Sequence, residues 1–203
     1  SGAELAYRWY PEMRSVTFSS ATMSVDGDFS HFNGSSGLSL LKEGRHREVS
    51  LPSGYDYDRN MSAIAVRDLP DPRDRGYLDA LVDLLFDVHV SMGGSVLTLF
   101  TNRREMELAH AALEPRLAAR GLSVAMQERG SSVRRLSRRF VEDRDLSLMA
   151  LKSFWEGFDA AGDTLRCVVI PKLPFSSPKD PLVQERSARD RAAWRRWSLP
   201  EAV

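Results

Sequence analysis

Short apolar segments alternate with helical patterns through the second half of the chain. The apolar segments are GSVLTLFT (94–101), LSVAMQE (122–128), LSLMALK (146–152) and LRCVVIPKLP (165–174). Each is short enough for a strand, and little polar alternation interrupts it, which is typical of strands that are buried on both faces. The helical patterns lie before and between them, at 75–94, 102–121 and 131–143. This order predicts an α/β fold with an open, mainly parallel sheet and helices on both faces.

The helical patterns also predict which side chains face the core. Apolar residues recur at helical spacing, and glycines mark the expected ends of two helices, Gly93 and Gly94 for the first and Gly121 for the second. Pro115 is a possible kink in the second helix. The predicted inward residues are Leu78, Leu81, Val82, Leu85 and His89; Met106, Ala109, Leu113 and Leu117; and Val133, Leu136 and Phe140.

The first half of the chain is less regular. The pattern predicts a strand in 14–24, an edge strand in 46–60 before a turn at Pro52 to Gly54, and a short strand in 62–72. Residues 26–44 are rich in glycine and serine, which indicates a loop or a short helix between loops. We expect a connecting segment at 1–35 and one α/β domain at 36–203.

Composition excludes several classes of protein. The 203 residues contain one cysteine, Cys167, so a disulfide or a cysteine zinc site within the chain is excluded, and a reducing compartment, the cytoplasm, is expected. No apolar stretch is long enough to span a bilayer. The net charge is zero, but residues 1–92 hold 9 basic and 14 acidic side chains while residues 93–203 hold 19 and 14. The second half therefore favours anionic partners. The chain begins without methionine and ends without a capping signal, so we expect it to be part of a longer protein.

Polar residues follow several of the predicted strands. They are Ser19 to Thr22, Thr101 and Asn102, Gln127, and Ser153 to Asp159. Ligands of an open parallel sheet bind at the carboxyl ends of its strands, so these four clusters are candidates for one continuous binding surface. Asn102 has two interpretations, an ordinary helix N-cap or a group beside a phosphate bound at the helix N-terminus, and the two are compatible.

Basic residues gather in two places. Arg134, Arg135, Arg138 and Arg139 lie on the side of the 131–143 helix away from its apolar stripe, and a second basic set surrounds Trp194 and Trp197. A solvated helix face is the usual meaning of such runs, and the tryptophans are more often core anchors. Arginine beside aromatic rings is also what single-stranded nucleic acid needs, because phosphates meet the charges while bases stack.

Catalytic patterns are weak. Glu156 and Asp159 allow a hydrolase with a carboxylate pair, but the sequence does not fix the distance between them. His31, His46, His89 and His110 show no metal-ligand spacing, so no metal site is expected. Neither G-x-x-x-x-G-K-[ST] nor G-x-G-x-x-G occurs in the chain. An independent nucleotide-hydrolysing site is therefore not expected.

The segment SFWEGFDAAGDTLRCVVIPKLPFSSPKDPLV (153–183) resembles the part of DinG-type and XPD-type DNA helicases of superfamily two that carries motif V. SVTFSSATMS resembles motif III of these helicases, VSLPSGYDYDRN the segment that follows it, and GSVLTLFTNRREM motif IV. Order and spacing agree over nearly the whole chain. The resemblance implies the second RecA-like domain of an ATP-dependent helicase that moves along single-stranded DNA in repair or replication.

The resemblance also implies roles for individual residues. Ser20, Ala21 and Thr22 would couple the nucleotide state to DNA movement, and Glu156, Gly157 and Asp159 would form the turn between DNA and the ATP side. DNA contacts would come from Thr101, Asn102, Gln127, Ser153, Arg134 and Arg138. The intact protein would use ATP and Mg²⁺ and a first RecA-like domain.

The chain also departs from the family pattern. The phosphate loop, the acidic metal box and the arginine motif VI are absent from it, as are iron–sulfur cysteines, and Gly54 stands where proline is common. We therefore expect no complete catalytic site, no stable binding of ATP or Mg²⁺ and no ATP hydrolysis by this chain alone. Two alternatives stay open, a non-catalytic nucleic-acid-binding module and a small α/β hydrolase.

Overall fold

The computed structural model describes residues 1–24, 26–151, 154 and 164–199. Its contacts divide the chain into two compact units. The sheet unit comprises residues 64–174, and the terminal unit comprises residues 1–63 together with 175–203. The predicted domain boundary at 35/36 remains a prediction.

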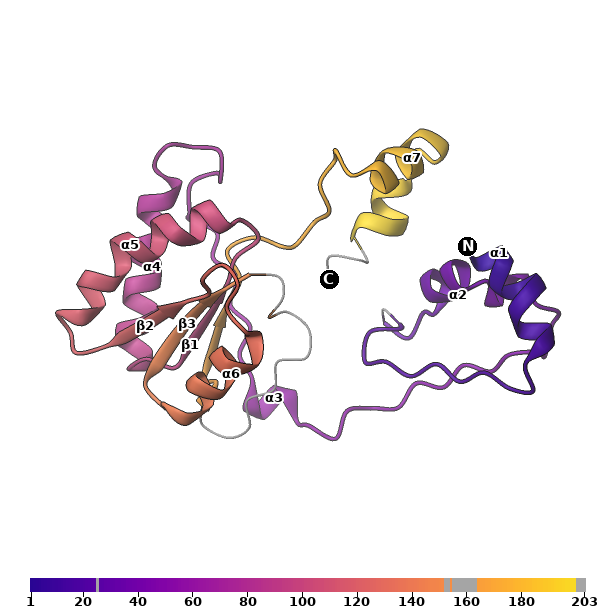
Figure 1. The fold of residues 1–203 in the computed structure, drawn as a ribbon, viewed down its shortest axis with the longest axis horizontal. Helices are drawn as coiled ribbons and strands as arrows, with labels where there is room; N and C mark the ends of the chain where they lie inside the picture. Colours follow the sequence, from indigo (N-terminus) through magenta and orange to yellow (C-terminus); the bar gives the residue numbers. More distant parts are fainter. Residues whose placement is uncertain (25, 152–153, 155–163, 200–203) are drawn as a thin grey trace. The chain divides into compact units, whose positions relative to one another are not determined.

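The sheet unit contains the parallel sheet that the sequence predicts (Figure 1). Its described strands are β1 (Val96–Leu99), β2 (Ser123–Met126), β3 (Leu146–Ala150) and β4 (Cys167–Val169), in the order β2-β3-β1-β4. Every neighbouring pair is parallel, and Leu97 of β1 lies opposite both Leu148 of β3 and Val168 of β4. The α/β fold class is confirmed.

Helices cover both faces of this sheet. They are α4 (Tyr77–Met92), α5 (Arg103–Ala118) and α6 (Val133–Glu142). Successive residues of β3 point to opposite faces: Met149 packs into the cluster under α4 and α5, while Leu148 and Ala150 pack into the cluster with Phe140 of α6. The central strands β1 and β3 are therefore buried along their whole length, because both faces of the sheet are covered there.

The inward residues of the three helices are those that the spacing predicts. In α5, Met106, Ala109, Leu113 and Leu117 are fully buried although Pro115 lies within the helix. The α4 helix ends at Gly93, whose φ of 65° is in the left-handed region. A Cβ on the following Gly94 would lie 2.2 Å from the carbonyl oxygen of Asp145, so the close approach of these two backbone segments requires glycine there.

The terminal unit consists of short helices and extended segments. The helices are α1 (Gly2–Glu4), η1 (Leu5–Trp9), η2 (Tyr10–Glu12), α2 (Ser30–Ser36), η3 (Leu38–Leu40), α3 (Tyr57–Asn60), α7 (Pro181–Arg189) and η6 (Trp194–Ser198). The Tyr10 hydroxyl donates to the carbonyl oxygen of Ser36 at 2.6 Å, and the rings of Phe18 and Phe32 pack edge to face at 5.2 Å. These contacts join residues 1–18 to α2.

The strands predicted in the first half are wrong. Residues 14–24, 46–60 and 62–72 contain no strand among the described residues, and the bend lies at 54–55 instead of 52–54. Val16, Leu51 and Ile64 are 41%, 82% and 85% exposed. Their residue types favour extended backbone, but a strand also needs a neighbour for its ladder of hydrogen bonds, and these segments pair with none here.

Two smaller expectations had different outcomes. The short helix expected within 26–44 is present as α2. The expectation that both tryptophans are core anchors is wrong for Trp194, which is 56% exposed and stacks on Phe175. Trp197 is half-buried and lies against His31 and Arg186.

In the described part of the chain, no helix is both long and apolar enough to cross a membrane.

Candidate nucleic-acid interface

The carboxyl ends of the strands bring several polar groups to one edge of the sheet unit. β1 leads into Thr101 and Asn102, β2 into Gln127, and β4 into Lys172. Because all four strands are parallel, these positions lie at the same edge. Figure 1 shows the ends of β1 and β2 at this edge, with the loops that lead from them to α5 and α6.

Asn102 caps α5 and is exposed. Its side-chain oxygen accepts hydrogen bonds from the backbone N–H groups of Arg104 at 2.9 Å and Glu105 at 3.4 Å. The N-cap interpretation is confirmed, while a phosphate at this place stays a prediction. Thr101, directly before it, is also exposed. A ligand can therefore reach both residues.

Gln127 is buried, with 8% of its surface exposed. Its side-chain Oε1 accepts from the backbone N–H of Leu151 at 2.9 Å, and its own N–H donates to the carbonyl oxygen of Met149 at 2.9 Å. Its carbonyl oxygen accepts from the guanidinium of Arg103 at 2.9 Å. Gln127 therefore ties the ends of β2 and β3 together and fixes Arg103 beside them.

A charged cluster that the sequence analysis missed joins β4 to α5. The Lys172 ammonium forms an ion pair with the Glu105 carboxylate, and it lies 4.7 Å from the centre of the Tyr77 ring. The side chains of Lys172 and Glu105 are 28% and 15% exposed. Burial, followed by the nearby charge of Glu105, raises the pKa of Tyr77 to about 12. The loop after β4 is thus held against the first turn of α5.

No local pattern could have identified this cluster. Lys172 and Glu105 are 67 residues apart in the sequence, and neither lies on an apolar stripe. The sequence did indicate that both residues lie near the same edge of the sheet, since each follows soon after a strand that ends there. Pairing them required the order of the strands, which places β4 next to β1.

The arginines of α6 form an exposed set. Arg134, Arg135, Arg138 and Arg139 are all exposed, and none of them forms an ion pair with another described residue. Ser132 caps the helix by accepting from the N–H of Arg135, and Phe140 is fully buried on the opposite side. The predicted division of α6 into an apolar inner side and a basic outer side is confirmed.

The remaining predicted site residues belong to the terminal unit or lie outside the described residues. Ser20, Ala21 and Thr22 are exposed in the terminal unit, where the Ser20 hydroxyl accepts from the N–H of Thr22 at 3.1 Å and stabilises a turn. Ser153, Glu156, Gly157 and Asp159 lie outside the described residues. The predicted coupling site therefore stays a prediction.

Residues suited to catalysis are structural where they are described. His89 is buried, and this burial lowers the pKa of its imidazole. Its Nδ1–H donates to the carbonyl oxygen of Leu85 at 2.6 Å. Burial likewise raises the pKa of the Cys167 thiol. No group of three or more histidine, cysteine, aspartate or glutamate side chains is placed to hold a metal ion among the residues described.

Comparisons with known proteins agree with this arrangement. The family model for the helicase C-terminal domain matches residues 85–203. The chain is 36% identical over 170 residues to the ATP-dependent DNA helicase YoaA of Escherichia coli, an alignment that covers 83% of the chain and 25% of the relative. It is 28% identical to the 3'-5' exonuclease DinG of Bacillus subtilis, covering 100% of the chain and 22% of the relative.

A third relative, the ATP-dependent helicase DinG of Mycobacterium tuberculosis, is 29% identical over 179 residues, covering 87% of the chain and 26% of the relative. The chain thus spans about a quarter of the length of these relatives. With the family model matched over residues 85–203 and a parallel sheet in the same region, the chain belongs to the helicase C-terminal domain family, in its DinG-type branch.

Proposed function

We propose that the chain is part of an ATP-dependent DNA helicase that couples ATP hydrolysis to translocation on single-stranded DNA in repair or replication. The observation that carries this proposal is the exposed carboxyl edge of the parallel sheet within the region that the helicase model matches. In this proposal, the sheet unit works as the second RecA-like domain. Its partner is a first RecA-like domain of the same protein, and the protein acts in the cytoplasm.

Single-stranded DNA runs along the carboxyl edge in this proposal. Thr101 and Asn102 contact the backbone where α5 begins, because N–H groups and the helix dipole attract phosphate there. Arg134 and Arg138 of α6 supply further charges, and the family resemblance adds Ser153 to the DNA contacts. Gln127 acts by holding Arg103 and the strand ends in place, since its side chain is buried.

ATP and Mg²⁺ bind between the two RecA-like domains in the proposed helicase. Ser20, Ala21 and Thr22, together with Glu156, Gly157 and Asp159, transmit the state of the nucleotide to the DNA track. The present sequence contains no phosphate loop, so it neither binds ATP and Mg²⁺ stably nor hydrolyses ATP alone. Phosphate release by the purified chain above a mock purification would contradict this statement.

The dependence of DNA binding on salt tests the proposed track. We expect fluorescence anisotropy with a labelled oligothymidylate to show weak binding that falls steeply with salt. Changing Arg134 and Arg138 together to glutamate removes two phosphate contacts, so the slope of log affinity against log salt should become shallower by about 1.4. Arg120→Glu is the matched control, because Arg120 is exposed after α5 at the opposite edge of the sheet.

A change at Asn102 separates its two roles. Aspartate caps a helix as well as asparagine does, so Asn102→Asp should leave the stability of the sheet unit unchanged within about 0.5 kcal/mol. The added negative charge repels a phosphate, so the affinity for single-stranded DNA should fall about tenfold at low salt. Equal affinity in Asn102→Asp and the unmodified chain would leave Asn102 as a cap only.

If Arg134→Glu/Arg138→Glu and Asn102→Asp both bind DNA like the unmodified chain, the carboxyl edge is not the DNA track. A non-catalytic DNA-binding module is the second candidate, favoured by the missing phosphate loop. The two functions differ in the response to ATP: if this chain replaces the matching segment of a DinG relative, which supplies both the phosphate loop and the arginine motif VI, DNA-stimulated ATP turnover is kept only if the chain belongs to a motor.

A further inference from the structure

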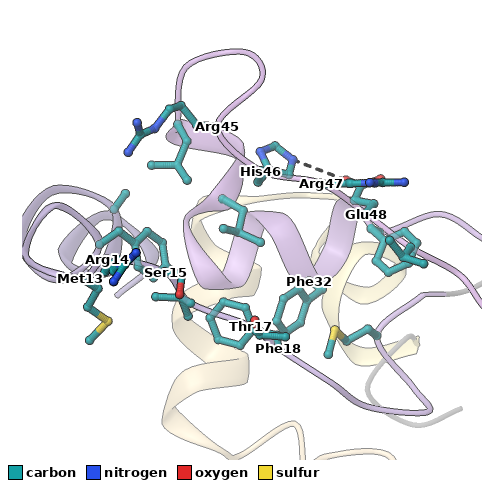
Figure 2. A pocket seen from close by; sticks show the side chains of 18 of the residues that line it. Met13, Arg14, Ser15, Thr17, Phe18, Phe32, Arg45, His46, Arg47 and Glu48 are labelled. Atoms are coloured by element: carbon teal, nitrogen blue, oxygen red, sulfur yellow. Dashed lines mark ion pairs between the residues drawn. The ribbon is translucent and has the colours of Figure 1, made fainter.

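The terminal unit contains a pocket that the helicase edge does not use. Its volume is about 540 Å³, within the range of pockets that bind small ligands. Its lining comes from residues 6–18, Met23, residues 29–41 and residues 45–49, all of which belong to the terminal unit. Figure 2 shows Phe18 and Phe32 side by side among the side chains that line the pocket.

Aromatic rings form the interior of the pocket. Phe18 meets Phe32 edge to face at 5.2 Å and Tyr10 at 6.4 Å. Phe18 is nevertheless 41% exposed, although apolar rings of this size are usually covered. Part of the Phe18 ring is therefore available to a flat ligand, and nucleobases stack on such rings.

Three arginines line the same pocket. Arg14, Arg45 and Arg47 are exposed, and none of them pairs with a carboxylate among the described residues. Glu48 is the acidic residue in the lining, but it already accepts from the side-chain amide of Asn33 and pairs with His46 at 3.6 Å. Figure 2 shows Arg14 and Arg45 on one side of the rings and Arg47 on the other.

These charges select the ligand. Guanidinium groups without partners favour an anion, and their placement on two sides of the rings suits a chain of phosphates better than a single one. A base can enter an aromatic pocket only when it is unpaired, which excludes duplex DNA. The combination of rings and arginines therefore matches a segment of single-stranded DNA.

We propose that this pocket is a second contact for single-stranded DNA, in which a base stacks on Phe18 and the flanking phosphates bind Arg14, Arg45 and Arg47. The choice of DNA as the ligand rests on the proposed function, while the pocket itself is separate from the edge formed by the strand ends. The pocket would hold one base, and it would not distinguish strongly between sequences because every base has a flat face.

Photocrosslinking of the full chain tests the location directly. An oligothymidylate containing 5-bromouracil is bound at low salt and irradiated, and the crosslinked peptides are identified by mass spectrometry. We expect crosslinks to peptides that contain Tyr10, Phe18 or Phe32. This readout uses the unmodified chain, so it does not depend on whether a variant folds.

Anisotropy measurements with variants test the contribution of each group. Phe18→Ala should weaken oligothymidylate binding about tenfold. Phe18→Tyr keeps the ring, so it should bind with the affinity of the unmodified chain. Arg45→Glu should weaken binding about fivefold and lower the salt dependence. Arg59→Glu is the control, because Arg59 is in the same unit and outside the lining.

The possible outcomes separate this proposal from the proposed function. If the oligonucleotide binds, responds to Arg134→Glu/Arg138→Glu and crosslinks only to the sheet unit, the pocket proposal is overturned and the helicase edge stands. If no oligonucleotide binds even at low salt, both fail. Equal affinity for thymidine monophosphate and for the oligonucleotide would identify a mononucleotide pocket instead, and saturable binding of an acidic peptide without DNA binding would identify a protein partner.

Discussion

The ion pair between Lys172 and Glu105 gives the sharpest prediction about the sheet unit. Changing Lys172 to methionine keeps a long side chain over the Tyr77 ring but removes the charge, so Glu105 loses its partner while 15% exposed. We expect the free energy of unfolding of the sheet unit to fall by about 2 kcal/mol. The affinity for single-stranded DNA should also fall, because the loop after β4 is no longer fixed beside Asn102.

The magnitude follows from the burial of the two side chains. Breaking a fully buried pair costs about 3–5 kcal/mol, whereas an exposed pair contributes about 0–1 kcal/mol. The exposed fractions of 28% and 15% place this pair between the two cases. Glu105 keeps a favourable interaction with the N-terminus of α5, which offsets about 0.3–1 kcal/mol of the loss.

Urea titration of the full chain by far-UV circular dichroism measures the change, and hydrogen exchange of the β1 and β3 amides assigns it to the sheet unit. A double-mutant cycle with Glu105→Gln should give a coupling energy of about 1 kcal/mol or more. Asp83→Asn is the matched control, because it breaks the ion pair between Asp83 and Arg116, whose side chains are 68% and 40% exposed, respectively. It should cost less than about 1 kcal/mol.

The reasoning would be refuted if Lys172→Met had the stability of the unmodified chain within about 0.5 kcal/mol, or if the cycle showed no coupling. Either result would mean that the pair is as weak as an exposed one. A loss of stability with unchanged DNA affinity would support the pair as a structural clamp and remove its link to the DNA track.

Three further predictions concern buried groups of the sheet unit. The Tyr77 hydroxyl has no hydrogen-bond partner among the described residues, so Tyr77→Phe should not lower stability. In the unmodified chain, stability should fall as the pH rises from 10 to about 12, because the pKa of Tyr77 is raised in the folded state and the unfolded state therefore ionises first. Urea midpoints measured across this pH range should show no such fall in Tyr77→Phe. The pKa of His89 is lowered in the folded state, so the unfolded state takes up a proton first and stability should fall as the pH drops below 6.5. In His89→Leu, the urea midpoint should change less between pH 7 and pH 5 than in the unmodified chain. Gly94→Ala should lower the melting temperature and destabilise by about 2 kcal/mol or more, since its φ is 90° and a Cβ would clash with Asp145; a melting temperature equal to that of the unmodified chain would contradict the close approach.

Local patterns were sufficient for most of the sheet unit. The buried residues of α4, α5 and α6 are, apart from Tyr77, among those that helical spacing predicts, because a helix that packs on a sheet must keep its apolar residues on one side. The strands β1 and β3 were recognisable because both of their faces are covered, which leaves a mostly apolar run. Asn102 was recognisable as a cap from its place before the first apolar residue of α5.

The same reasoning failed where a structure depends on a distant neighbour. Residues 14–24 and 62–72 have the composition of strands, yet no strand in the described part of the chain pairs with them, and most of their side chains remain exposed. The residue types indicate how well the side chains suit a sheet, but they do not indicate whether another strand is present to pair with. For the same reason, the exposure of Trp194 could not be predicted from its spacing to Trp197.

The α/β class, the inward faces of the helices, the helicase resemblance and the polar residues at the strand ends can all be read from the order of residues along the chain. The helix faces and the strand ends are local features, because each depends on periodicity or capping within about twenty residues, while the resemblance depends on the order of motifs. Three contacts depend on the tertiary structure: Lys172 pairs with Glu105, the Gln127 side chain is used inside the fold, and Phe18 shares a pocket with three arginines. Such contacts join residues far apart in the chain, and they exist only once the order of the strands and the packing of the extended segments have been set.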